Sequence, residues 1–186
     1  IKLSLGEAFS ERSENRWGDV LVNLEETIKC FEEGFAVFSY ENNLDREWWA
    51  SCQNELGNVY CQRSKIKGDS NDIEKAINAY ESALKVYPEK TLDWAMVQMN
   101  LGNSYCVRQG KPLENLTKAI KCYKNSLTVR KQETYPTEWA DVQINLAQAY
   151  YHRGLLGHSQ NAEDLEQAIE CSKSCLLYTS DAADDP

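Results

Sequence analysis

Three tryptophans, Trp49, Trp94 and Trp139, stand 45 residues apart in this chain. Each one opens a similar phrase, and the three phrases read WASCQNELGNVYCQR, WAMVQMNLGNSYCVR and WADVQINLAQAYYHR. A second phrase alternates with the first and reads NLEETIKCF, DIEKAINAY, NLTKAIKCY and DLEQAIECS, beginning at residues 23, 72, 115 and 164. Self-similarity at a fixed period of about 20–50 residues is typical of stacked repeat architectures. The chain is therefore expected to be a piece of a helical solenoid.

The first phrase has the spacing of a helix. Trp49, Cys52 and Leu56 follow steps of three and four residues, which places them on one helical face. A small residue recurs in the middle of this helix, as Gly57, Gly102 and Ala147. Because a mid-helix glycine costs roughly 1 kcal/mol relative to alanine, we expect a neighbouring helix to approach closely at this point.

The second phrase also predicts a helix, with an apolar stripe that includes Ile73, Ile77 and Tyr80. An Asn or Asp precedes each stripe, and we expect it to accept backbone N–H groups at the helix start: Asn23, Asp72, Asn115 and Asp164. Loops of unequal length separate the phrases, and Pro88 and Pro136 mark breaks between units. Each unit should therefore be an antiparallel helix pair whose apolar stripe only its neighbours can cover.

The repeat divides the chain into four units, at about 1–40, 41–88, 89–132 and 133–174, of which the two outer ones are incomplete. The segment that follows, CLLYTSDAADDP at 175–186, departs from the repeat pattern. It resembles the translation of a transposase adapter used in sequencing libraries. We expect it to be an adapter read-through that is not native and does not contribute to folding, and the natural protein to continue beyond Ser174.

Composition limits the classes of partner. The net charge is −9, and about −6 without the three aspartates of 175–186. Such a surface repels phosphate, which disfavours nucleic acid and anionic membranes as partners, and no apolar run approaches the roughly 20 residues that span a bilayer. The cysteines lie within helical phrases without any C-x-x-C pair. This usage fits a reducing compartment and predicts a cytoplasmic protein.

These features resemble the tetratricopeptide repeat. Its Leu-Gly…Tyr helix is matched by Leu56, Gly57 and Tyr60, and its Ala…aromatic…Ala helix with a closing Pro is matched by Ala76, Tyr80, Ala83 and Pro88. The period of about 45 residues departs from the usual 34. The resemblance implies an all-α fold, a right-handed α-solenoid of antiparallel helix hairpins. The phrases EWA or DWA, NLG and NLE also resemble bacterial arrays that often precede a caspase-like CHAT peptidase or an NTPase module.

The recurring charged and aromatic residues admit two interpretations. Arg63, Arg108 and Arg153 could form a row of anion-binding groups, but their place near helix C-termini favours a structural role. The tryptophan row could stack a ligand, but it fits packing between repeats better. His152 and His158 lack a third metal ligand at motif spacing. We expect no metal, no cofactor and no catalytic residue.

The remaining face of the first-type helix varies between units, whereas its core positions repeat. In the resembled family this face lines a concave groove that holds protein segments, and an Asn after the Gly often contacts the backbone of a bound peptide. None of its positions carries the Lys that the peptide-carboxylate clamp subfamily needs. The resemblance thus assigns a partner-binding groove to Asn54, Asn58, Met99, Asn103, Val107, Ile144, Gln148, Tyr151 and His152.

Two functions follow. The first is a non-catalytic protein–protein interaction scaffold that binds a protein segment in this groove, including the possibility that the segment is a downstream domain of the same chain. The second is a regulatory or sensor segment of a larger enzyme, such as a CHAT-type protease or an NTPase. Sequence beyond residue 174 would discriminate between the two.

Overall fold

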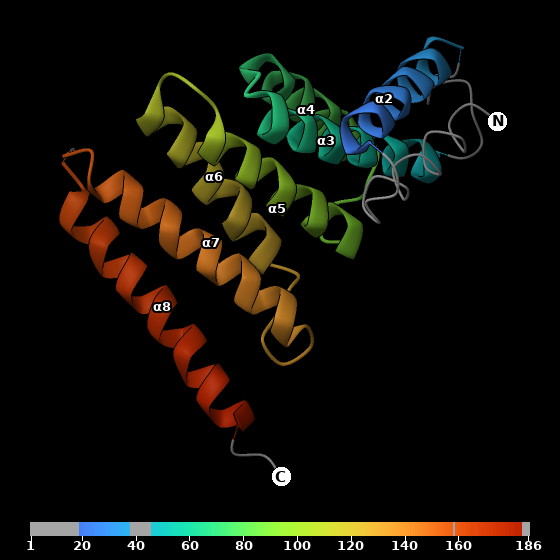
Figure 1. The fold of residues 1–186 in the computed structure, drawn as a ribbon. Coiled ribbons are helices and arrows are strands. Elements are labelled where there is room, and N and C mark those ends of the chain that lie inside the picture. The colour runs from blue at the N-terminus through green and yellow to red at the C-terminus, as the bar shows by residue number, and fades with distance from the viewer. Residues whose placement is uncertain (1–18, 38–45, 158, 184–186) are drawn as a thin grey trace. The chain divides into compact units, whose positions relative to one another are not determined.

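The computed structural model describes residues 19–37, 46–157 and 159–183, with side chains as far as Leu176. Throughout these residues the only regular secondary structure is α-helix (Figure 1). The helices are α2 (Val20–Val37), α3 (Arg46–Lys67), α4 (Ser70–Leu84), α5 (Leu92–Val107), α6 (Pro112–Leu127), α7 (Pro136–Gly154) and α8 (Asn161–Ala183). The predicted all-α fold of sequential antiparallel helix pairs is confirmed. The chain divides into two compact units, residues 1–88 and 89–186.

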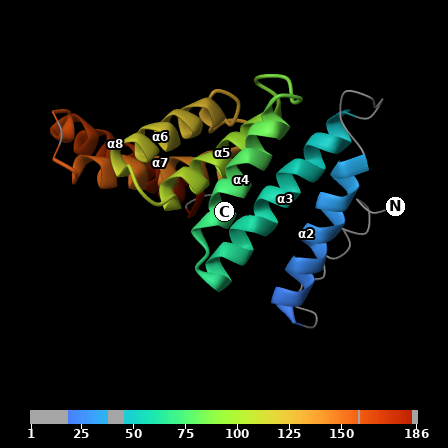
Figure 2. The same ribbon diagram turned by 90° about the horizontal axis from the view of Figure 1, so that it is seen from above.

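In the first unit α3 packs along α4 and α2 packs against α3, so the three helices lie side by side (Figure 2). Leu24, Phe31, Val59 and Tyr80 are almost fully buried between them. Trp49, which is 7% exposed, packs edge-on against Phe35 of α2 with ring centroids 5.8 Å apart. This tryptophan is therefore a packing anchor on the preceding helix, as the repeat predicted, and is not available to stack a ligand.

The second unit contains two hairpins, α5 with α6 and α7 with α8, joined through the contact of α6 with α7. Val97, Tyr123 and Val142 are almost fully buried. The ammonium group of Lys124 on α6 lies 5.4 Å from the ring centroid of Tyr150 on α7. A lysine of one hairpin therefore lies over an aromatic ring of the next hairpin.

The mid-helix glycines receive an aromatic ring from the partner helix, which confirms the predicted close approach. A Cβ atom on Gly57 would lie 2.5 Å from the ring of Tyr80, and one on Gly102 would lie 2.7 Å from the ring of Tyr123. Both distances are far below van der Waals contact. Glycine is thus required at the crossing of α3 with α4 and of α5 with α6, because the tyrosine ring occupies the space of a side chain.

The prediction that the recurring Asn or Asp caps the second helix of each pair is wrong for the hairpins where the caps are described. Helix α4 is capped by Asp69, whose carboxylate accepts from the backbone N–H of Asn71. Asp72 lies inside the first turn and is 1% exposed. There it binds Arg63 of α3 through two hydrogen bonds of 2.6 and 2.7 Å. In this hairpin the recurring position therefore joins the two helices, because its carboxylate faces the end of the preceding helix.

The segment 175–186 departs from the repeat pattern in sequence, yet its residues as far as Ala183 are helical. Helix α8 runs without a break from Asn161 to Ala183. Cys175 is 8% exposed, and its Sγ lies 3.7 Å from the carbonyl oxygen of Ala140 on α7. This first residue of the segment therefore packs on the hairpin. The first half of the first repeat unit lies outside the described residues.

Candidate functional site

The predicted groove residues of α3 are largely built into the first unit. Asn54 is 6% exposed. The amide oxygen of Asn58 accepts a 2.8 Å hydrogen bond from the hydroxyl of Tyr80, and its amide nitrogen donates to Glu55 over 3.4 Å. Both ends of the Asn58 amide therefore have hydrogen-bond partners within the first unit. Tyr80 can bond to Asn58 because Gly57, which has no side chain, allows the tyrosine ring to approach closely.

On α5, in the second unit, the same bond recurs between Tyr123 and the amide oxygen of Asn103, again at 2.8 Å. Asn103 is nevertheless an exposed residue. Met99 is half-buried, and its Sδ lies 3.3 Å from a guanidinium nitrogen of Arg130. Val107, at the end of the helix, is 58% exposed. Helix α5 thus exposes Asn103 and an apolar side chain to solvent.

Helix α7 carries the most open part of the predicted set. Ile144 is 47% exposed and Tyr151 is 49% exposed, while Gln148 and His152 are also exposed. The rings of Tyr151 and His152 meet edge to face with centroids 5.5 Å apart. Exposure of large apolar side chains to water is unfavourable, by roughly 25 cal/mol per Å² of apolar surface. Ile144 and Tyr151 are thus the exposed apolar side chains of the predicted set on α7, and Val107 is the one on α5.

A hollow of about 860 Å³ opens beside these residues, between α7 and α8. Three of its lining residues, Ile144, Gln148 and Tyr151, belong to the groove predicted from the sequence, and none of those on α8 does. The lining residues are Ile144, Ala147, Gln148, Tyr151, Leu165, Ala168, Ile169, Ser172, Lys173, Cys175 and Leu176. The hollow is wide enough for a large side chain, and all but its last two residues precede the segment 175–186.

The position that creates the hollow is visible in the sequence. Ser172 stands where Tyr80 and Tyr123 stand in the two preceding hairpins, eight residues after the recurring Asn or Asp. Opposite it, Ala147 replaces the glycine. Ser172 is exposed, and its hydroxyl donates to the carbonyl oxygen of Ala168 in its own helix. Alignment of the second phrase to its last copy could have identified this missing ring.

The arginine row has a structural role in two of its copies. Arg153 binds Asp164 through hydrogen bonds of 2.6 and 2.8 Å, as Arg63 binds Asp72, and both aspartates are fully buried. The carboxylate raises the pKa of each guanidinium above its ordinary value, because it stabilises the charged form. Opposite Arg108 the acid is replaced by Asn115, which donates instead to the carbonyl oxygens of Arg108 and Gly110.

The surroundings of Cys106 do not favour nucleophilic chemistry. Cys106 lies 3.4 Å from the hydroxyl of Tyr123, and loss of hydration raises the pKa of its thiol, which is opposite to the activation that a nucleophile needs. Among the described residues, no three His, Cys, Asp or Glu side chains are grouped so as to hold a metal ion.

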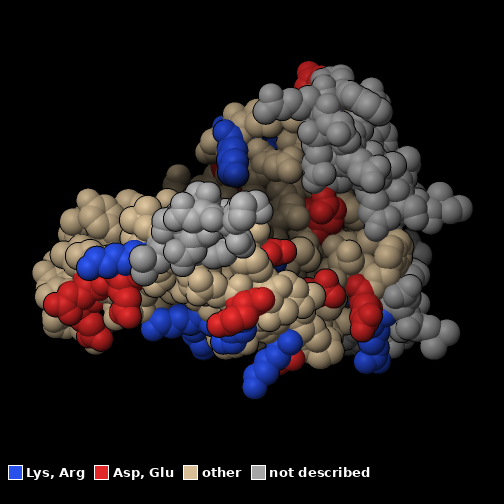
Figure 3. Space-filling view, turned by 90° about the horizontal axis from the view of Figure 1, so that it is seen from below, with Lys and Arg blue, Asp and Glu red and all other residues tan. Residues whose placement is uncertain are grey.

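Surface charge is mixed. Acidic and basic side chains lie next to one another on the face drawn in Figure 3, and the described atoms there show no continuous basic field. Within the same described ranges, no helix combines the length and apolar character that crossing a bilayer requires.

Comparison with known proteins found a matching family model and similar solved structures. Residues 57–90 match the family model of the tetratricopeptide repeat. Among solved structures, the crystal structure of BtubC (BKLC) from P. vanneervenii is similar, with a TM-score of 0.68 and 20% identity over 98% of this chain. This chain spans 66% of that protein, just under two thirds. No curated protein matches the sequence. The chain therefore contains a tetratricopeptide repeat region and has a repeat arrangement of that type.

Proposed function

We propose that this tetratricopeptide repeat region is a non-catalytic scaffold that holds a protein segment on the exposed face of α5 and α7. Tetratricopeptide repeat proteins generally mediate protein–protein interactions. The observation that carries the proposal is the exposure of Ile144 and Tyr151, at 47% and 49%, where both line one hollow on α7, and of Val107 on α5 at 58%. Apolar side chains gathered in this way are typical of an interaction site.

The polar groups on the same face suit an extended or helical protein chain. Asn103, Gln148 and His152 are exposed there, and each amide offers donors for backbone carbonyl groups. The net charge of −9 opposes binding of phosphate backbones, so the proposed partner is a protein. We place the protein in the cytoplasm, since its cysteines before residue 175 lie within helical phrases without any C-x-x-C pair, a usage that fits a reducing compartment.

Replacement of exposed apolar side chains by aspartate tests this function. The double variant Val107→Asp/Ile144→Asp should remain folded, because both positions are exposed, and should lose proteins that the original chain captures from extracts of its source. A matched control is Val22→Asp/Ile66→Asp in the first unit, since Val22 and Ile66 are 52% and 53% exposed. Quantitative mass spectrometry of the captured proteins, beside melting curves, gives the comparison.

Selective loss in the Val107→Asp/Ile144→Asp variant supports the face of α5 and α7. If both double variants retain the same proteins as the original chain, this face is not the binding site.

A further inference from the structure

The first two described hairpins are each filled by a tyrosine of their own. Tyr123 of α6 lies against Gly102 of α5, and its hydroxyl donates to Asn103. Tyr80 makes the same pair of contacts with Gly57 and Asn58. The rings are 1% and 2% exposed, so they complete the core of their hairpins.

The hairpin of α7 and α8 has the residues that surround this tyrosine position, but it lacks the tyrosine ring. Ala147 and Gln148 stand at the places of Gly102 and Asn103, and Ser172 stands at the place of Tyr123. All three line the hollow of about 860 Å³. Since Gln148 is exposed and its side chain ends in an amide like that of Asn103, an acceptor for a phenolic hydroxyl remains at the rim.

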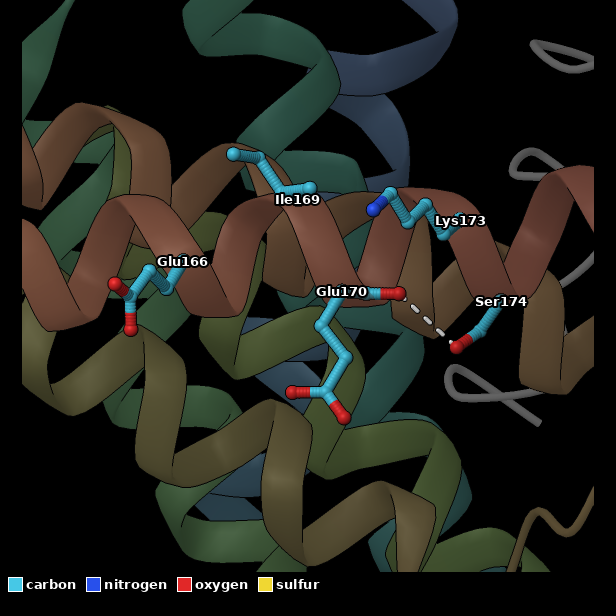
Figure 4. A pocket seen from close by; sticks show the side chains of 5 residues that line it. All are labelled: Glu166, Ile169, Glu170, Lys173 and Ser174. Carbon is cyan, nitrogen blue, oxygen red and sulfur yellow. Dashed lines mark hydrogen bonds between the residues drawn. The ribbon is translucent and has the colours of Figure 1, made fainter.

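The rim of the hollow continues an interface that the second unit already uses. Ile120 of α6 is 5% exposed, whereas Ile169, at the equivalent position of α8, is 55% exposed. Lys124 of α6 lies over Tyr150 of α7, and Lys173 is its equivalent on α8. Ile169 and Lys173 point to the same side of α8, and Glu166 and Glu170 point to another (Figure 4). On α6 this face contacts α7, whereas on α8 the equivalent face is exposed to solvent.

We propose that this hollow receives a tyrosine side chain carried by a helical segment of the bound protein, which lies on α8 as α7 lies on α6. The inference rests on the proposed function and specifies its partner. The incoming ring replaces the one that Ser172 lacks, packs on Ala147, and donates its hydroxyl to Gln148. Ala147, Gln148 and Ser172 all precede the segment 175–186.

Titration with p-cresol, the side chain of tyrosine as a free molecule, tests the site directly. Apolar cavities of this kind bind small aromatic molecules. Methyl signals of Ile144, Ala147 and Ile169 should shift in nuclear magnetic resonance spectra as p-cresol is added. Toluene, which lacks the hydroxyl, should bind more weakly, and Gln148→Ala should remove that difference.

The repeat itself supplies the variant that closes the hollow. Ala147→Gly/Ser172→Tyr restores the glycine and tyrosine of the two preceding hairpins, and should weaken p-cresol binding by about tenfold or more because the ring now belongs to the chain. Ser51→Tyr, at an exposed position of α3, is the matched control and should bind p-cresol unchanged.

Failure of p-cresol to shift the methyl signals of the original chain would overturn the proposal, even if the double variant does not fold. Equal binding by a folded Ala147→Gly/Ser172→Tyr variant would overturn it as well. If that variant still captures the proteins lost on Val107→Asp/Ile144→Asp substitution, the scaffold function stands and the tyrosine-receiving role of the hollow is wrong.

Discussion

The hydroxyl of Tyr123 donates a 2.8 Å hydrogen bond to the amide oxygen of Asn103. This bond crosses from α6 to α5, directly beside the glycine on which the tyrosine ring lies. Its exact counterpart joins Tyr80 to Asn58 in the hairpin before it. Two asparagines that look like partner-binding amides in the sequence therefore also hold their own hairpins together.

Replacement of Asn103 by alanine should cost about 0.5–1.5 kcal/mol of unfolding free energy, the usual contribution of one hydrogen bond. The hydroxyl of Tyr123 would then keep the Sγ atom of Cys106, 3.4 Å away, as a weaker partner. Gln148→Ala, where no tyrosine of the hairpin is present, should change stability by less than about 0.5 kcal/mol. Urea unfolding followed by circular dichroism measures both, and equal effects of the two substitutions would contradict the role given to the Tyr123 bond.

Gly102→Ala should destabilise the second unit although alanine is the better helix former. The new Cβ would lie 2.7 Å from the ring of Tyr123. Overpacking of this kind typically costs 1–3 kcal/mol, about as much as or more than the roughly 1 kcal/mol that alanine gains in helix propensity. In a Tyr123→Ser background the same substitution should be neutral or stabilising, since Ala147 and Ser172 already coexist in the next hairpin. Thermal unfolding of the original chain, the two single variants and the double variant gives a double-mutant cycle. Additive changes in the free energy of unfolding would argue against a clash between the new Cβ and the ring of Tyr123.

Arg63→Ala should be more damaging than the joint replacement of both members of its ion pair. Asp72 is 1% exposed, and without the guanidinium its carboxylate would be buried without a charged partner, which typically costs about 3–5 kcal/mol. Arg63→Met/Asp72→Asn removes both charges, and Asn already occupies this position as Asn115. We expect the double variant to be the more stable of the two in urea unfolding, and the reverse order would show that Asp72 does not depend on Arg63.

Stability should fall at alkaline pH. Burial raises the pKa of Tyr80 and of Tyr123 above the ordinary value of 10.0, because desolvation disfavours the phenolate. Burial also raises the pKa of Cys171 from 9.0 to about 11. A group whose pKa is raised in the folded state contributes fully below its unfolded pKa and loses that contribution as pH rises above it.

The loss should therefore begin near pH 9 and steepen above about pH 10, where phenols of the unfolded chain ionise. Urea unfolding at a series of pH values from neutral to about 11 gives the profile. Tyr123→Phe should flatten the upper part of the curve, although it also removes one hydrogen bond at every pH. An unchanged slope in that variant would mean that the phenol of Tyr123 ionises alike in both states.

Much of the fold follows from the sequence because residues that recur at the repeat interval occupy equivalent packing positions. The interval between Trp49, Trp94 and Trp139 predicts helix pairs, and the tryptophan of α3 does pack on the preceding helix through Phe35. The recurring glycines predict close helix approach for a local steric reason, since a residue without Cβ is needed only where another atom takes its place. Periodic spacing and the need for a small residue can therefore both be recognised in the sequence without the structure.

Only the tertiary structure determined which polar groups were already in use. Asn58 and Asn103 lie off the apolar stripe, yet tyrosines from the facing helix reach their amide oxygens. Asp72 looks like a helix cap in sequence, yet its partner is Arg63 of the previous helix. Sequence spacing fixes which side of one helix a residue occupies, but the identity of the atom opposite depends on the rotation and distance of the second helix. For the same reason, the exchange of Tyr for Ser172 could be read in the sequence, while the hollow that it leaves against Ala147 became evident only when α7 and α8 were packed together.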